Sequence, residues 1–154
     1  MDDSMKLSAE ARLRRLLRVF AETGGDGPRT RAFDNLPADS RAHLLEYAAL
    51  TADELPVIAY FGSPVHWVLI TTDRIVMGRQ AGLLSMPWAD LENATTDTAH
   101  VHAAFASGAG GKLSLSRLRL QRRDAEDMEF EVEAGPAFFG LWNVLKTIAS
   151  LRKE

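Results

Sequence analysis

Two histidines near the middle of the chain have a spacing that suits metal binding. His100 and His102 are two positions apart in residues 98–105, a run with the composition of a β-strand. Alternate residues of a strand project from the same face, as histidine ligands of a metal can. The sequence offers no evident third ligand. We therefore expect strand histidines without a bound metal, and His100 and His102 remain the only metal-ligand candidates.

A glycine-rich segment follows, with the sequence SGAGGKLS at 107–114. A phosphate-binding loop needs a glycine five residues before its Gly-Lys pair and a serine or threonine after it. This chain has Ala106 and Leu113 at those two positions. The pattern fails twice, so we predict a flexible hairpin loop.

Signals for catalysis are poor elsewhere. The chain has no cysteine, no Gly-x-Ser-x-Gly elbow and no His-Glu-x-x-His helix. Aspartates and glutamates are plentiful, but no pair stands apart from the general surface population. We expect a protein that is not an enzyme and uses no cofactor.

Cations and acids alternate near the carboxyl-terminal end, in SRLRLQRR followed by DAEDMEFEVE. If these are paired strands with their apolar residues on one face, Arg119 lies opposite Glu129 or Glu131. Arg117 then lies opposite Glu131 or Glu133. This basic cluster is neutralised by its own neighbours, so we predict exposed cross-strand pairs and no ligand site.

The first helix is the better candidate for a contact surface. Residues 9–20 place Leu13, Leu16, Leu17 and Phe20 at helical spacing. Four arginines are spread around the rest of this helix: Arg12, Arg14, Arg15 and Arg18. The apolar stripe predicts packing on the rest of the protein. The alternative is that these arginines lie on an anionic membrane surface or contact a partner.

Residues 65–79, VHWVLITTDRIVMGR, predict a hairpin that is apolar on both faces. A two-residue turn at 72–73 pairs Leu69 with Val76, and Val68 with Met77. An antiparallel hairpin with one face in water normally alternates apolar and polar residues. Another element must therefore cover the outer face, and we expect the first helix to do so.

Further elements follow from the same patterns. A second helix is predicted within LPADSRAHLLEYAAL, with Asn35 or Asp39 as its N-cap. An amphipathic helix is predicted from Gly135 and Pro136 to the end of the chain, with Phe138 on its apolar stripe. Seven strands are predicted, at residues 55–61, 65–71, 74–79, 83–88, 98–105, 113–121 and 127–133.

This order of elements resembles the bacterial pleckstrin-homology-like (PH-like) and GRAM-like domains. The resemblance rests on ADELPVIAYF, WVLITTDRIVM, SMPWADLENA and the final FFGLWNVLKTIASL, and covers residues 51–151. It implies a mainly β (α+β) fold, in which a seven-stranded, two-sheet barrel is capped by a carboxyl-terminal helix. The division is then a two-helix extension at 1–50 and a PH-like domain at 51–154. Phosphoinositide-binding members carry Lys and Arg in the first strand-to-strand loop, whereas this loop is GSPVH, which disfavours lipid headgroups.

Composition limits the function further. The 154 residues carry a formal net charge of -3, which argues against nucleic-acid binding. No run of apolar residues reaches the length of a membrane span, and no signal peptide is evident, so we expect a cytoplasmic protein. The high ratio of arginine to lysine is typical of a GC-rich bacterial genome.

The resemblance implies a non-enzymatic binding module whose partner is a protein or its own copies. Alternatives are a peripheral membrane adaptor and an NTF2-like small-molecule or enzymatic pocket.

Overall fold

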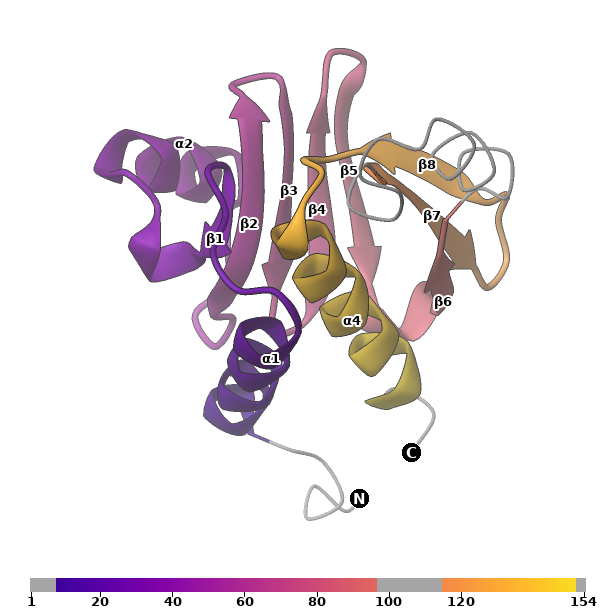
Figure 1. Ribbon diagram of the computed structural model, residues 1–154. Helices are drawn as coiled ribbons and strands as arrows, with labels where there is room; N and C mark the ends of the chain where they lie inside the picture. The colour runs from indigo at the N-terminus through magenta and orange to yellow at the C-terminus, as the bar shows by residue number, and fades with distance from the viewer. Residues whose placement is uncertain (1–7, 97–114, 152–154) are drawn as a thin grey trace.

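The computed structural model describes residues 8–96 and 115–151. Its described part is an α+β fold with two antiparallel sheets and three α-helices (Figure 1). The helices are α1 (Ala9–Thr23), α2 (Ala38–Ala48) and α4 (Pro136–Leu151), with short 3-10 turns η2 (Phe33–Asn35) and η3 (Trp88–Asp90). The strands are β1 (Thr30–Ala32), β2 (Pro56–Ser63), β3 (His66–Thr71), β4 (Arg74–Arg79), β5 (Gly82–Pro87), β6 (Leu91–Thr95), β7 (Arg117–Arg122) and β8 (Met128–Glu131).

The two sheets have different sizes, and His66 of the first contacts the second. The first has the order β1-β2-β3-β4-β5 and the second the order β6-β7-β8. The His66 ring of β3 stacks on Phe130 of β8, with centroids 4.5 Å apart, and its Nε2 lies 2.7 Å from the carbonyl oxygen of Glu131. Within the described residues the strands do not close into a hydrogen-bonded barrel. The predicted α+β class is confirmed at this coarser level.

Most of the predicted strands are confirmed. Those at 55–61, 65–71, 74–79 and 83–88 correspond to β2 to β5, and those at 113–121 and 127–133 to β7 and β8. The predicted strand at 98–105 lies outside the described residues. Strands β1 and β6 were not predicted. Strand β1 has only three residues, and β6 reads LENAT, in which polar residues outnumber apolar ones.

The predicted register of the β3–β4 hairpin is correct. Leu69 pairs with Val76 and Val68 with Met77. Val68 and Met77 face the main core, which we call the inner face of the sheet, together with buried residues of α4. Leu69 and Val76 face the opposite way, which we call the outer face, and pack in a second cluster. Both faces of the hairpin are therefore buried, as its sequence predicts.

The element covering the outer face is α2, so the expectation that α1 covers it is wrong. Leu44 and Ala48 of α2 pack on the outer face, together with Phe33 and Leu36 from the segment before it. These four side chains complete the second cluster.

Helix α1 packs beside α4 over the inner face instead (Figure 1). Leu16 and Phe20 of α1 are buried in the main core. Gly140 of α4 permits close approach, since a Cβ there would lie 2.8 Å from Cδ1 of Phe20. The apolar stripe of α1 thus has its partner in α4.

The predicted N-caps of α2 are also wrong. The N-cap position is Pro37, which makes no side-chain cap hydrogen bond. The side chain of Asn35 donates to Asp26 instead, at 2.8 Å. Asp39 lies inside the first turn, where a carboxylate interacts favourably with the helix dipole.

The terminal helix α4 has the predicted buried stripe. Phe138, Leu141, Leu145 and Ile148 are each at most 1% exposed. Trp142 beside them donates its indole N–H to the carbonyl of Ala94 in β6, at 2.9 Å. The helix thereby connects to the second sheet. None of the helices in the described ranges has the length and apolar character required to cross a bilayer.

Candidate functional site

The metal-ligand candidates of the sequence are not placed by the structure, because His100 and His102 lie outside the described residues. Among residues 8–96 and 115–151, no group of three or more His, Cys, Asp or Glu side chains is arranged to hold a metal ion.

Arg12, the first of the four arginines of α1, makes structural contacts. Its Nε donates to the carbonyl oxygen of Thr72 at 2.9 Å, and its Nη2 lies 3.1 Å from Oδ1 of Asp73. Its guanidinium also lies over the Trp88 ring, 5.7 Å from the centroid. Arg12 therefore anchors the β3–β4 turn to α1, and it is not free to contact a membrane.

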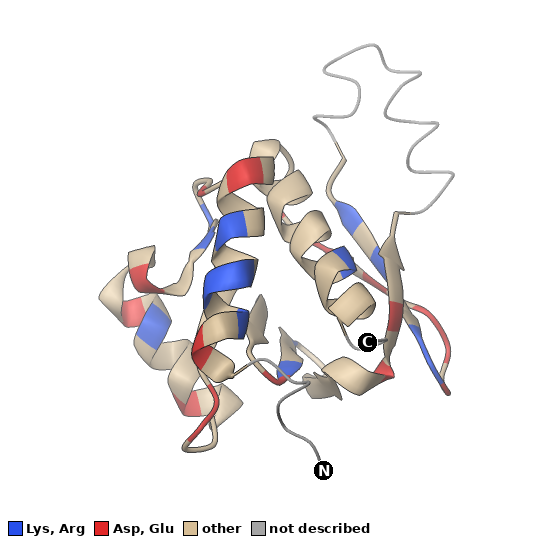
Figure 2. Cartoon of the chain, turned by 90° about the horizontal axis from the view of Figure 1, so that it is seen from below, with Lys and Arg blue, Asp and Glu red and all other residues tan. Residues whose placement is uncertain are grey.

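Arg14, Arg15 and Arg18 are exposed on α1, along which basic residues gather in Figure 2. None of these three forms an ion pair with another described residue. Because the apolar stripe of α1 is packed on α4, this helix has no free apolar face to insert into a bilayer. Any membrane contact here would depend on charge alone.

The cross-strand pairs predicted in the second sheet are present. Arg119 lies opposite Glu129, with Nη2 and Oε2 2.7 Å apart, and Arg117 lies opposite Glu131, with Nε and Oε1 3.5 Å apart. All four side chains are at least one-third exposed. These pairs belong to the solvated surface. This agrees with the prediction that the apolar residues of both strands share one face and the charged residues the other.

A buried carboxylate lies beneath the β3–β4 turn. Glu54 is 4% exposed, and its Oε2 accepts hydrogen bonds from Nε of Arg74 at 2.8 Å and from the hydroxyl of Thr71 at 2.5 Å. Its Oε1 accepts from Nη2 of Arg74 and from the backbone N–H of Thr51. The carboxylate is thus fully enclosed by donors.

These donors set the protonation of Glu54. Burial acts to raise its pKa, but the hydrogen bonds from Arg74, Thr71 and Thr51, with the positive charge of Arg74, lower the pKa below its ordinary value. Arg74 also donates to the carbonyl oxygens of Ala48 and Ala49, at 2.7 and 3.2 Å. The network therefore fastens the end of α2 to the sheet. Its polar groups are all engaged, which fits a structural role.

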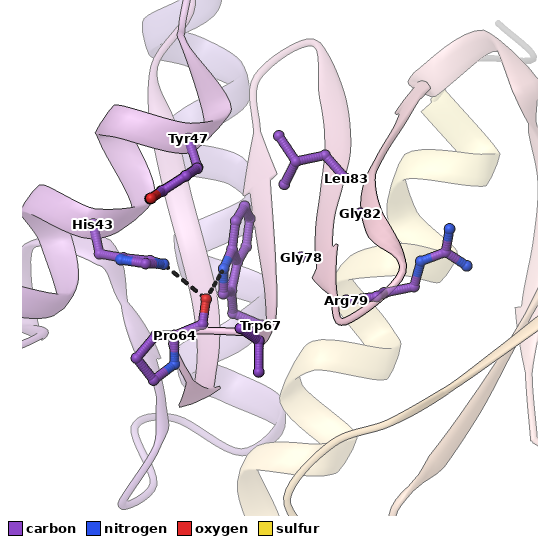
Figure 3. Close-up of a pocket in the computed structure, with 9 residues that line it drawn as sticks. His43, Tyr47, Pro64, Trp67, Gly78, Arg79, Gly82 and Leu83 are labelled. Atoms are coloured by element: carbon purple, nitrogen blue, oxygen red, sulfur yellow. Dashed lines mark hydrogen bonds between the residues drawn. The ribbon is translucent and has the colours of Figure 1, made fainter.

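An open groove lies beside α2 at the other end of the β3–β4 hairpin. It encloses about 310 Å³ and runs between His43 and Tyr47 of α2 on one side and Gly78 to Leu83 of the β4–β5 hairpin on the other (Figure 3). Trp67 of β3 lines it between these two sides.

Hydrogen bonds and close packing hold the floor of the groove. His43 Nε2 and the indole N–H of Trp67 both lie within hydrogen-bond distance of the carbonyl oxygen of Pro64, at 2.8 and 3.2 Å (Figure 3). The indole lies directly across Gly78, where a Cβ would come within 2.3 Å of it. Gly78 does not have a positive φ, so it is required for space and not for backbone conformation.

Exposed apolar side chains concentrate at this groove. Among the described residues, the large hydrophobic side chains that are clearly exposed are Leu45, Tyr47, Val65 and Leu83, at 43%, 47%, 52% and 51%. Tyr47, Val65 and Leu83 line the groove, whereas Leu45 does not. Sequence patterns do not reveal this site, because its apolar residues lie in three separate segments.

The side chains that line the groove determine what it can bind. Its walls are apolar and aromatic, and the titratable side chains that line it are His43, Tyr47 and Arg79. Among the described residues that line it, none is acidic. The chain matches no family model, no curated protein and no solved structure.

Proposed function

We propose that the protein is a cytoplasmic, PH-like binding module without enzymatic activity, and that it binds protein segments through the groove beside α2. The single observation that carries this proposal is the concentration of exposed apolar side chains there. Soluble proteins rarely expose contiguous apolar patches unless the patch contacts a partner.

The order of elements supports the PH-like part of the proposal. Strands β2 to β5 form one antiparallel meander, β6 to β8 form another, and α4 follows them. The segment before residue 51 adds α1, β1 and α2 around this arrangement. The division of the chain into 1–50 and 51–154 remains part of the proposal.

Selection from a displayed library of random linear peptides tests the groove directly. We expect selected peptides to be rich in apolar residues, and their affinity, measured by fluorescence anisotropy, to fall at least about tenfold on Leu83→Asp, because a carboxylate would enter the apolar wall. The matched control is Leu45→Asp, which changes a similarly exposed leucine outside the groove and leaves the affinity unchanged. Peptides that bind both variants as well as the wild type would overturn the groove as the contact surface.

A second candidate function is that of a peripheral membrane adaptor, favoured by the three exposed arginines of α1. We expect co-sedimentation with vesicles containing anionic lipid at low salt, and loss of it at high salt, because the contact depends on charge alone. Changing Arg14, Arg15 and Arg18 together to Gln should abolish this binding. Arg12 is left unchanged in this variant, because it anchors the β3–β4 turn.

The neutral-lipid vesicle is the control for this experiment. Equal sedimentation with neutral and anionic vesicles, or binding that survives the triple substitution, would contradict an electrostatic contact by α1.

A further inference from the structure

The free edge of β5 lacks the features that normally protect a sheet edge. Strand β5 lies at one edge of the first sheet, and β4 is its only neighbour among the described strands (Figure 1). Natural edge strands are protected from further pairing by charged residues, a bulge, an internal proline or a very short length. Strand β5 has six residues, none of them charged, and pairs with β4 without a register shift. Its proline stands only at the last position.

The other edges of the two described sheets carry such protection. Strand β1 has only three residues. Strand β6 carries Glu92, and β8 carries Glu129 and Glu131. The carbonyl oxygen of Glu131 is also contacted by the ring of His66. Among the described edges, β5 is therefore the one best suited to receive another strand.

The backbone groups of Leu83 and Ser85 point away from β4. Residues of an antiparallel pair alternate between those that exchange hydrogen bonds across the pair and those that do not. Just beyond β5, the N–H of Trp88 donates to the carbonyl oxygen of Asp73 at 3.0 Å, and this bond continues the register of the two strands. Counting back from Trp88 in steps of two, the even-numbered residues of β5 bond to β4. The N–H and C=O groups of the odd-numbered Leu83 and Ser85 therefore face outward.

These outward groups are open to a partner. Leu83 is 51% exposed, and Ser85 is exposed as well. The N–H and C=O groups of these two residues have no hydrogen-bond partner among residues 8–96 and 115–151. A row of alternating donors and acceptors of this kind is matched by the backbone of another extended strand.

We propose that two copies of the chain pair through β5 in a two-fold symmetric, antiparallel homodimer, in which Leu83 of each copy lies opposite Ser85 of the other. In this register every outward N–H and C=O group of Leu83 and Ser85 gains a partner in both copies. The inference goes beyond the proposed function, because it uses the backbone edge of β5 and not the groove.

Pro87 disfavours the neighbouring register. If Ser85 lay opposite Ser85 of the second copy, Leu83 would lie opposite Pro87. The nitrogen of Pro87 has no hydrogen to donate, so the carbonyl oxygen of Leu83 would stay without a partner. The register that pairs Leu83 with Ser85 leaves neither residue with an unpaired group.

A second copy is favoured as the occupant because β5 is complementary to itself. In the proposed register Leu84 faces Leu84 of the second copy across the two-fold axis, which is an apolar match. A charged residue on β5 would be brought close to its own copy by the same symmetry, and the sequence GLLSMP contains none. Hydrogen bonding, apolar character and charge are thus all compatible with self-pairing.

Sedimentation velocity over a concentration series tests the dimer. We expect the wild type to shift from monomer to dimer as its concentration rises, and Ser85→Pro to stay monomeric, because proline removes the outward N–H and spares the bonds to β4. The matched control is Ser85→Ala. It also loses the hydroxyl that accepts a hydrogen bond from Arg74 at 3.2 Å, but it keeps the N–H and should dimerise as the wild type does. Thermal unfolding of both variants verifies that the fold is retained.

Cysteine cross-linking tests the register without disturbing the backbone, since the chain has no cysteine of its own. Leu84→Cys should form a disulfide-linked dimer on mild oxidation, because the two Cα atoms on the axis lie about 4.5 Å apart, within the range of a disulfide. Ser85→Cys is the matched control. Its two Cα atoms are diagonal neighbours roughly 7–8 Å apart, so cross-linking should be at least about tenfold slower.

The homodimer is refuted by a wild type that remains monomeric at every concentration. A dimer that Ser85→Pro leaves intact refutes it equally, because such a dimer does not use the edge of β5. Faster cross-linking of Ser85→Cys than of Leu84→Cys overturns the proposed register. The peptide selection at the groove is a separate measurement, so peptides that bind a monomeric wild type would support the proposed function while the homodimer fails.

Discussion

Replacing Glu54 with alanine should lower the free energy of unfolding by about 3–5 kcal/mol, because it leaves a charged partner without its counter-ion in a mostly buried network. Arg74 is the residue affected, since its guanidinium is 22% exposed and keeps only the carbonyl oxygens and a serine hydroxyl as acceptors. The hydroxyl of Thr71 also loses the acceptor that it contacts at 2.5 Å. Equilibrium unfolding in urea, followed by circular dichroism, measures this loss.

The matched control for Glu54→Ala is Glu129→Ala. Glu129 also pairs with an arginine, Arg119, but both side chains are more than one-third exposed. Solvated ion pairs of this kind contribute about 0–1 kcal/mol. A loss for Glu54→Ala that is no larger than the loss for Glu129→Ala would contradict the structural role of the buried network.

The pH dependence of stability gives a second measurement on Glu54. Its pKa in the folded protein lies below the ordinary value of 4.5 that applies to the unfolded chain. The unfolded state therefore binds a proton more readily, so the contribution of Glu54 is fully present above pH 4.5 and declines as the pH falls through the folded-state pKa. We expect the stability difference between wild type and Glu54→Gln to shrink on acidification below pH 4.5. A difference that is constant or grows there would contradict the lowered pKa.

The alternation of side chains between the two faces of a strand explains which parts of the fold are predictable from the sequence. The pairing of Leu69 with Val76 follows from a two-residue turn and from alternation along each strand, and both are local properties. The same alternation limits the partner of Arg119 to Glu129 or Glu131, and the structure has Glu129 there. Apolar residues on both faces of the hairpin correctly indicate that something covers the outer face.

The identity of that cover is not a local property. Helix α1 has the longer and clearer apolar stripe, yet its partner is α4, which is distant in sequence. The outer face is covered by the short stripe of α2, completed by Phe33 and Leu36. These two residues belong to a 3-10 turn and its end, where no helical or strand periodicity marks them.

The groove was unpredictable for a related reason. Tyr47, Val65 and Leu83 are single apolar residues in α2, in the β2–β3 turn and at the start of β5. A lone exposed hydrophobic residue is ordinary on a protein surface, so none of the three is a signal by itself. They become one surface only when α2 packs on the outer face, which is the contact that the sequence does not reveal.

The floor of the groove leads to the second large effect, because Trp67 connects the binding surface to the second core cluster. Its side chain is 1% exposed and packs with Leu69 and Val76. Trp67→Ala should lower the free energy of unfolding by about 3–5 kcal/mol, since it empties a large volume that the sheet cannot fill by relaxing. The same substitution should abolish peptide binding to the groove. Unfolding in urea, followed by circular dichroism, measures the stability loss.

Gly78 provides the test of whether the indole lies across the strand as described. In the wild type, Gly78→Ala should destabilise by about 1–3 kcal/mol, because its Cβ has no room beside the indole. In the Trp67→Ala background that obstacle is gone, and the same change should become neutral or stabilising, since alanine is favoured over glycine in a strand by about 0.5–1 kcal/mol. The sign of the Gly78→Ala effect therefore reverses between the two backgrounds. Equal destabilisation in both would mean that Gly78 is required by its backbone and not by the Trp67 side chain.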